Sequence, residues 1–137
     1  MTQFRFPLQS MLVLRRAARD RRRADLHAAL AAVHELEARL EQLQQQREPV
    51  DRQLADASRQ LTLSPSRLRR LHAIRSQIMR VQMSLRARYQ NLADRAAAEK
   101  IRVTDSVRDV QVLENLRDSR QHRYRCRQAR QAERDHT

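Results

Sequence analysis

The sequence predicts an all-α protein, a long antiparallel two-helix coiled-coil hairpin. Three observations carry this prediction. The 137 residues include no glycine, only 3% are aromatic while 33% are charged, and apolar residues recur at alternating steps of three and four. Such composition and spacing are typical of long amphipathic helices and coiled coils. Without glycine, the chain lacks the residue that phosphate-cradling loops and tight hairpin turns need, which argues against dinucleotide-binding folds and P-loops.

A first helix is expected over about residues 8–61. Its stripe of coiled-coil positions, called here the seam, has one polar exception, Arg47, and reads back through Leu8 and Leu12. The central seam positions are Leu26, Ala29, Val33, Leu36, Leu40, Leu43, Arg47, Val50, Leu54, Ala57 and Leu61. Pro49 lies inside this helix, where it removes a backbone donor, so we expect a kink there. A break into two helices is the alternative.

A turn is expected at about residues 62–64, followed by a second helix over about 65–130. Ser64 can cap this helix, and Pro65 suits its first position. The second seam is expected at Leu71, Ile74, Ile78, Val81, Leu85 and Leu92, and then at Ala96, Glu99, Val103, Ser106, Val110 and Leu113. The second half is shifted by four residues, which predicts a stutter over residues 89–96.

Two seams joined by a short connection fold back most simply as one hairpin over residues 1–137. Opposed residues then have numbers that add to about 127, and both termini come to the same end. An extended, swapped dimer would bury similar seams and is the alternative.

Positive charge is concentrated near both termini. The formal net charge is +13; residues 1–23 hold seven arginines and one acid, and residues 117–137 hold seven arginines and three acids. The hairpin brings these two segments together into an anion-attracting end. All basic residues except Lys100 are arginines, which pair with carboxylates or phosphates in a bidentate way. The arginines of residues 1–23 also resemble an organellar presequence, which is a further alternative.

No constellation for catalysis, metal binding or cofactor binding is evident in the sequence. His27 and His34 share a helix face without a third ligand, and Cys126, the one cysteine, has no partner for an internal disulfide. A two-helix hairpin also offers no pocket that could exclude water from a reaction. We therefore expect a protein that is not an enzyme and that needs no cofactor.

The N-terminal sequence Phe4-Arg5-Phe6-Pro7-Leu8-Gln9-Ser10-Met11-Leu12, followed by Arg15, resembles the start of the flagellar FliJ family. The chain length, the central turn and the basic run Arg123-Tyr124-Arg125 are also similar to this family, so the resemblance covers nearly the whole chain. Pro7 and Pro49 are not matched to family features.

The resemblance implies a component of the flagellar type III export apparatus, cytoplasmic and peripheral at the inner face of the cell membrane. In this family the hairpin acts as a stalk in the ring of the export ATPase FliI, approaches the export gate protein FlhA and escorts export chaperones. Together with the charge distribution, it places the ATPase-ring contact at Phe4, Phe6, Arg15, Arg16, Arg19, Arg120 and Arg123. The best match to the family's gate-binding face is Leu71, Arg75, Ile78 and Gln82, for which packing inside the hairpin is the alternative.

Two other function classes fit the same composition. A basic helical hairpin could grip nucleic-acid phosphates without reading sequence. Against this, only Phe4, Phe6, Tyr89 and Tyr124 could stack on bases, so no specific nucleic-acid partner is expected. A generic structural coiled coil that forms a dimer is the third class.

Overall fold

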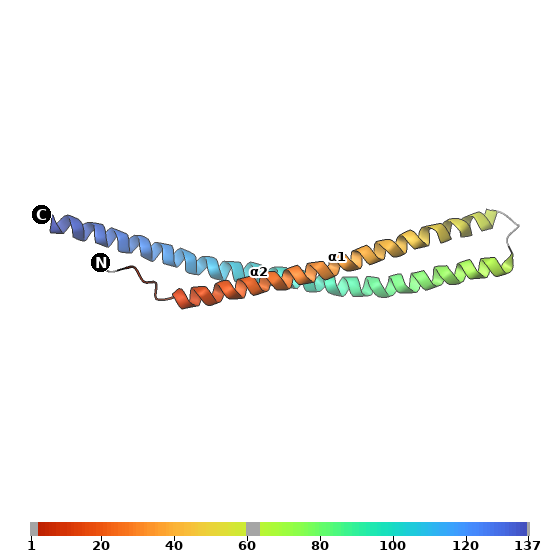
Figure 1. Cartoon of the computed structure of the whole chain (residues 1–137), viewed down its shortest axis with the longest axis horizontal. Coiled ribbons are helices and arrows are strands. Elements are labelled where there is room, and N and C mark those ends of the chain that lie inside the picture. Colours follow the sequence, from red (N-terminus) through yellow and green to blue (C-terminus); the bar gives the residue numbers. More distant parts are fainter. Residues whose placement is uncertain (1–2, 60–63, 137) are drawn as a thin grey trace. The chain divides into compact units, whose positions relative to one another are not determined.

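The protein consists of two long α-helices that pack against each other as an antiparallel hairpin. The computed structural model describes residues 3–59 and 64–136. Helix α1 covers Gln9–Arg59 (51 residues) and helix α2 covers Pro65–Asp135 (71 residues), with no strand among the described residues (Figure 1). The predicted all-α coiled-coil hairpin is confirmed.

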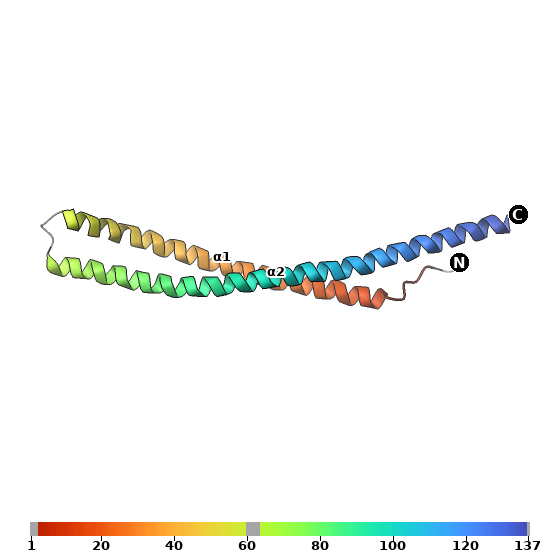
Figure 2. The same ribbon diagram turned by 180° about the vertical axis from the view of Figure 1, so that it is seen from behind.

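Contacts group the chain into two compact units. The terminal unit comprises Met1–His27 and Ala98–Thr137, and the central unit comprises Ala28–Ala97. Within the terminal unit, the beginning of α1 and the C-terminal part of α2 lie side by side in both views (Figures 1 and 2). Pairs that bond across the helices, such as Arg75 with Asp51 and Arg16 with Glu114, have residue numbers that add to about 127, as the hairpin predicts.

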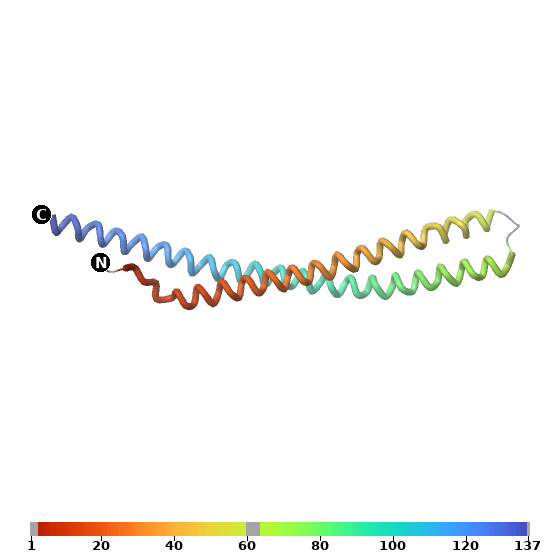
Figure 3. Tube along the Cα trace, viewed as in Figure 1, coloured from red at the N-terminus to blue at the C-terminus, as the bar shows by residue number. Residues whose placement is uncertain are grey.

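Helix α1 begins one residue later than expected and is continuous through Pro49 (Figure 3). At its start, the Gln9 amide donates a hydrogen bond to the Phe6 carbonyl at 3.1 Å, and the Leu12 amide donates to the Leu8 carbonyl at 3.0 Å. The alternative of a break at Pro49 is wrong, while the kink stays a prediction. The expected helix end at residue 61 and most of the expected turn, residues 62–64, lie outside the described residues.

Helix α2 begins at Pro65 with the predicted cap. The Arg67 amide donates to Ser64 Oγ at 3.4 Å, and the Leu68 amide donates to the Ser64 carbonyl at 3.2 Å. The helix ends at Asp135, five residues beyond the expected end near residue 130. Its last turns contain Ala, Arg, Gln and Glu, which favour helix, and no Gly or Pro that would stop it.

The seam of α1 in the central unit is as predicted. Val33, Leu36 and Leu43 are buried, and the remaining described seam positions from Ala29 to Ala57 are half-buried. Leu71, Ile78 and Ala96 are buried on α2. Burial of apolar side chains along these two stripes stabilises the helix pair, because neither helix can bury its stripe alone.

The stutter predicted in α2 is wrong. Ile74 is 42% exposed, and the half-buried residue beside it is Arg75. Arg75, Gln82 and Tyr89 occupy the seam at intervals of seven, so the heptads run through residues 89–96 without interruption. The prediction assigned the apolar neighbours Ile74 and Val81 to the seam in place of these polar residues. The heptad positions after them were therefore read as shifted by four residues.

Polar side chains connect the helices in the middle of the central unit, and we call this group the register layer. Its members are Gln44, Arg47 and Asp51 on α1 with Arg75 and Gln82 on α2. Gln82, only 2% exposed, donates from Nε2 to Gln44 Oε1 at 3.2 Å and accepts from Arg47 Nη1 at 3.1 Å. Asp51 accepts from Arg75 Nε at 2.8 Å. Asp51 Oδ2 also lies 3.2 Å from Arg47 Nε, an ion pair without the alignment of a hydrogen bond.

The terminal unit has its own small core. Leu12 and Val110 are buried at seam positions, and Phe6 is buried from the non-helical segment that precedes α1. Glu99 also occupies a seam position and is only 8% exposed. Arg102 Nη1 donates to Glu99 Oε1 at 2.8 Å, whereas Glu99 Oε2 is buried without a hydrogen-bond partner.

Candidate functional site

The non-helical residues 3–8 lie against the C-terminal part of α2 and form a clasp. Phe6 is buried there, and the guanidinium carbon of Arg120 stands 5.8 Å from the centre of its ring. The rings of Phe4 and Tyr124 are 5.6 Å apart and tilted by 47°. The two aromatic residues before α1 thus anchor this segment to α2 by ring contacts.

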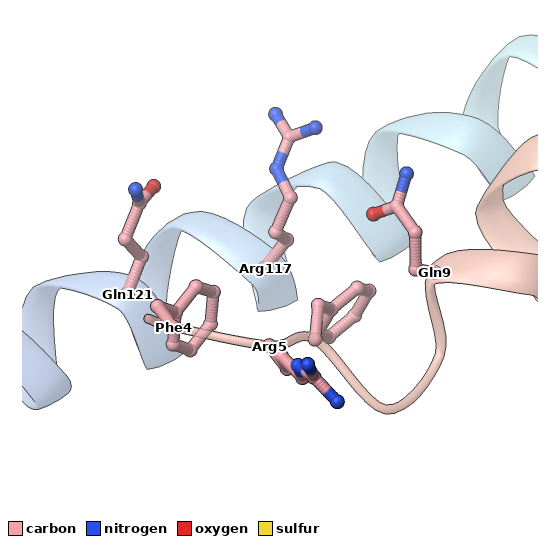
Figure 4. Close-up of a pocket in the computed structure, with 6 residues that line it drawn as sticks. Phe4, Arg5, Gln9, Arg117 and Gln121 are labelled. Atoms are coloured by element: carbon pink, nitrogen blue, oxygen red, sulfur yellow. The ribbon is translucent and has the colours of Figure 1, made fainter. Parts of the chain in front are cut away.

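A shallow hollow of about 580 Å³ lies beside the clasp (Figure 4). In Figure 4, Arg117 and Gln121 extend from α2, and Phe4 lies on the N-terminal segment below them. The lining residues are Phe4, Arg5, Phe6, Gln9, Arg117 and Gln121. The lining therefore combines two aromatic rings, two guanidinium groups and two amides, with no carboxylate among the described residues.

A second hollow, of about 410 Å³, is also formed by the clasp and α2, and its lining is more strongly basic. Four arginines line it together with two aromatic rings and two further residues: Arg5, Arg120, Arg123, Arg127, Phe4, Tyr124, Gln3 and Pro7. Within residues 3–59 and 64–136, no acidic side chain contributes to this lining. Guanidinium groups gathered in this way favour an anionic ligand, because each can donate two parallel hydrogen bonds to a carboxylate or phosphate.

The predicted ATPase-ring residues on α1 are engaged within the hairpin. Arg16 donates from Nε and Nη2 to Glu114 Oε1 at 3.3 and 3.1 Å, and Arg15 Nη1 lies 3.5 Å from Asp109 Oδ2. Arg19 Nε lies 3.3 Å from Asp20 Oδ1. These arginines already form ion pairs with nearby carboxylates, so they are less available to a partner than the sequence alone suggests.

The arginines of α2 form a surface that the sequence interpretation recognised only in part. Arg120 and Arg123 are exposed, and both were predicted as contact residues. Arg127 and Arg130 continue the same face of the helix, but the prediction did not include them. We call the set Arg120, Arg123, Arg127 and Arg130 the arginine stripe. Its steps of three, four and three place all four side chains on one face of the helix. That spacing was readable in the sequence and could have identified the two missed residues.

The predicted gate-contact residues face α1 in the central unit. Leu71, Ile78 and Gln82 are buried, and Arg75 is half-buried beside Asp51. These four positions therefore take part in packing inside the hairpin, which was the alternative to a gate contact. A partner could reach the buried Leu71, Ile78 and Gln82 only where α2 separates from α1.

Histidine and cysteine side chains assemble no metal centre in the part of the chain that the structure describes. Over residues 3–59 and 64–136, no three His, Cys, Asp or Glu residues are grouped so as to hold a metal ion. His34 Nδ1 lies 3.4 Å from Glu37 Oε2, and Cys126 Sγ lies 3.7 Å from His122 Nε2. Over the same residues, neither helix has an apolar stretch sufficient to cross a bilayer.

Comparison with known proteins adds no family or fold assignment. No protein-family model, no curated protein and no solved structure matches this chain.

Proposed function

We propose that this protein is a stalk-like component of the flagellar type III export apparatus. In this proposal the terminal unit engages the ring of the export ATPase FliI and promotes its hydrolysis, and the hairpin links the ring to the export gate protein FlhA and to export chaperones. The proposed location is the cytoplasm, peripheral at the inner face of the cell membrane.

One observation carries the proposal: the two parts of the FliJ-like resemblance contact each other. Phe4, from the N-terminal motif, packs on Tyr124, from the basic C-terminal run, with ring centres 5.6 Å apart. Phe6, from the same N-terminal motif, contacts Arg120, three residues before that run. Two separate similarities therefore combine into one surface of one unit, which is what a shared binding function would require.

The electrostatics of this surface support a negatively charged partner. Arg5 and Arg123 are exposed, line the same hollow and make no ion pair within the described residues. Attraction between exposed charges speeds encounter and orients the partner, and salt weakens it. A carboxylate-rich lining of an ATPase ring would supply the negative charge that Arg5 and Arg123 attract.

A paired charge reversal tests the contact with the ATPase. The variant R5E/R123E reverses two charges that line the second hollow, whereas R80E/R86E makes the same change of net charge at exposed positions of the central unit. We expect R5E/R123E to reduce stimulation of ATP hydrolysis by about tenfold and R80E/R86E to leave it within about twofold. Helicity should be unchanged in both, because exposed ion pairs contribute little to folding. Full stimulation by R5E/R123E would refute the ATPase proposal.

The proposed gate contact requires a local opening of the hairpin if it uses Leu71, Ile78 and Gln82, because these side chains are buried. A chain with cysteines in place of Glu41 and Arg86, which are exposed on opposite helices of the central unit, and with Cys126→Ser, can be locked by a short bifunctional thiol cross-linker. We expect FlhA binding in the form without the cross-link and its loss in the cross-linked form. Equal binding in both forms would move the gate contact to other residues.

Nucleic-acid binding is the second candidate, favoured by the absence of any acid over residues 119–132, which include five arginines. The ring contacts count against it, because Phe4 is engaged with Tyr124, and Phe6 is buried under Arg120. Few ring faces are left on which bases could stack. Tight, salt-resistant binding of single-stranded DNA by the full chain would support this candidate.

A further inference from the structure

We propose that the arginine stripe seats an acidic α-helix of a partner protein, whose carboxylates recur at steps of three and four residues. The inference deepens the proposed function by stating which kind of element the terminal unit would hold. It rests on that function only for the identity of the partner. The recognition geometry itself follows from α2.

The stripe is continuous and free of competing acids. Arg120, Arg123, Arg127 and Arg130 are all exposed, and the chain has no Asp or Glu over residues 119–132. Among the described residues, no carboxylate pairs with Arg123, Arg127 or Arg130, and the Arg120 guanidinium lies over the Phe6 ring. The charges of this face are therefore available to a partner.

The face beside the stripe is polar and uncovered. Gln128 and Gln131 follow Gln121 and Tyr124 at seam spacing, but both are exposed. An amide surface flanked by arginines suits a helix with a polar, acidic contact face better than one with a leucine-rich seam. The same arrangement of charged residues beside a contact face selects partners in coiled coils.

The spacing favours a helix over a nucleic-acid strand. Steps of three and four residues along α2 correspond to about 4.5 and 6 Å of axial rise, and carboxylates at the same steps on a second helix rise equally. In duplex DNA the phosphates of one strand rise about 3.4 Å per nucleotide along the axis and wind around it, so a straight row of arginines follows them over only a short distance. Each arginine can then meet one carboxylate through a forked pair of hydrogen bonds.

The clasp holds one end of the stripe in place before any partner arrives. Phe6 is buried beneath Arg120, and Tyr124, one residue after Arg123, is packed on Phe4. Contacts that restrict side chains in the free protein lower the entropy lost on binding. Binding should therefore begin at Arg120 and Arg123 and extend toward Arg130.

A pair of synthetic helical peptides tests the inference with the full chain. Both contain four glutamates in the same Ala- and Gln-rich background; one places them at steps of three, four and three, and its isomer at steps of five, which spreads them around the helix. Binding is measured by fluorescence anisotropy at about 0.15 M salt, where distant charges are screened. We expect the first peptide to bind about tenfold more tightly than its isomer.

Matched reversals on the protein complete the test. The variant R123E/R127E/R130E should lose about tenfold or more in affinity for the first peptide, and R80E/R86E/R95E, with the same net charge at exposed central positions, should stay within about threefold. Equal affinity for both peptides would overturn the inference. Tighter, stripe-dependent binding of single-stranded DNA, or stripe-dependent self-association in sedimentation, would also overturn it and assign the face to phosphates or to a second copy.

The ATPase assay separates this inference from the proposed function. If the stripe variant loses the peptide but still stimulates FliI fully, the acidic helix belongs to another partner, and the ATPase proposal is decided by R5E/R123E. If stimulation depends on the stripe but the two peptides bind equally, the ATPase proposal stands and the helix inference fails.

Discussion

Arg47 Nη1 donates a 3.1 Å hydrogen bond to Oε1 of Gln82, joining the two helices at positions where an apolar coiled coil would place leucine. Gln82 is nearly inaccessible to solvent and also bonds to Gln44. Polar residues at core positions commonly fix the register of a coiled coil at a cost in stability. The register layer fixes the alignment of the two helices of the central unit in this way.

Replacing one partner of this bond should destabilise the protein. Gln82→Leu leaves the Arg47 donor without its acceptor, and we expect a loss of about 1–3 kcal/mol in the free energy of unfolding, measured by urea titration. The double variant Arg47→Leu, Gln82→Leu should recover the part of the loss that comes from the unpaired Arg47, whereas Gln44 Oε1 lacks its donor in both variants. A double variant as unstable as the single one would argue against register-layer bonding as the cause.

Truncation of a seam leucine should be costly, whereas truncation of an exposed apolar residue should not. Leu43 is buried, and Leu43→Ala should lower the free energy of unfolding by about 2–4 kcal/mol. Met83 is 67% exposed, and Met83→Ala should change it by less than about 0.5 kcal/mol. Similar losses in the two variants, measured by urea titration, would show that the seam has been placed on the wrong face.

Removing the buried acid of the terminal unit should stabilise the hairpin. Glu99 Oε2 is buried without a hydrogen bond, so Glu99→Leu replaces an unsatisfied polar atom by apolar surface. We expect a gain of about 1–2 kcal/mol in the free energy of unfolding and a higher Tm. The exposed Glu133→Leu is the matched control and should leave the Tm almost unchanged. A lower Tm for Glu99→Leu would indicate that Glu99 has a bonding role beyond Arg102.

Stability should fall at strongly alkaline pH through Tyr89. Its hydroxyl donates a 3.0 Å hydrogen bond to Glu37 Oε1, and this bond, together with the carboxylate charge, raises the pKa of Tyr89 above its ordinary value of 10.0. A raised pKa in the folded state means that the contribution is present below pH 10.0 and is lost as the pH rises through the folded-state pKa. Tyr89→Phe should weaken this alkaline dependence in Tm measurements, and an unchanged pH profile would contradict the assignment.

Spin labels can distinguish a hairpin within one chain from a swapped dimer. Glu41 and Arg86 are exposed on opposite helices of the central unit and can be replaced by labelled cysteines in a Cys126→Ser background. A distance below about 25 Å is expected, since packed helix axes are about 8–10 Å apart. The signal should persist when labelled chains are refolded with an excess of unlabelled chains. Its disappearance on such dilution would identify the swapped dimer.

Apolar periodicity predicted the architecture because a single physical rule, burial of one stripe per helix, decides it. Val33, Leu36 and Leu43 were identifiable in this way, as was the cap formed by Ser64. The register of α2 was harder, because Arg75 and Gln82 occupy seam positions that hydrophobicity assigns to Ile74 and Val81. Their burial depends on hydrogen bonds to specific residues of the other helix, which no pattern along one helix can reveal.

The candidate site was predictable in its location but not in its composition. Charge counts indicated the terminal unit, yet the engagement of Arg16 by Glu114 depends on a partner 98 residues away. The burial of Phe6 beneath Arg120 likewise follows from a non-helical segment folding onto α2, where no heptad rule applies. Arg127 and Arg130 required only attention to the spacing of arginines along one face.

Pro49 has a consequence for how α1 opens and closes. It has no N–H to give to the Gln45 carbonyl, so the backbone ladder is interrupted at this turn although the helix continues. Arg47 and Asp51, on either side of Pro49, are each bonded to α2, through Gln82 and Arg75. The two stretches of α1 are thus coupled through the opposite helix and through the Arg47–Asp51 ion pair, in addition to their own backbone. In amide hydrogen exchange, residues 50–59 should behave as a separate foldon that exchanges by sub-global opening ahead of residues 33–47.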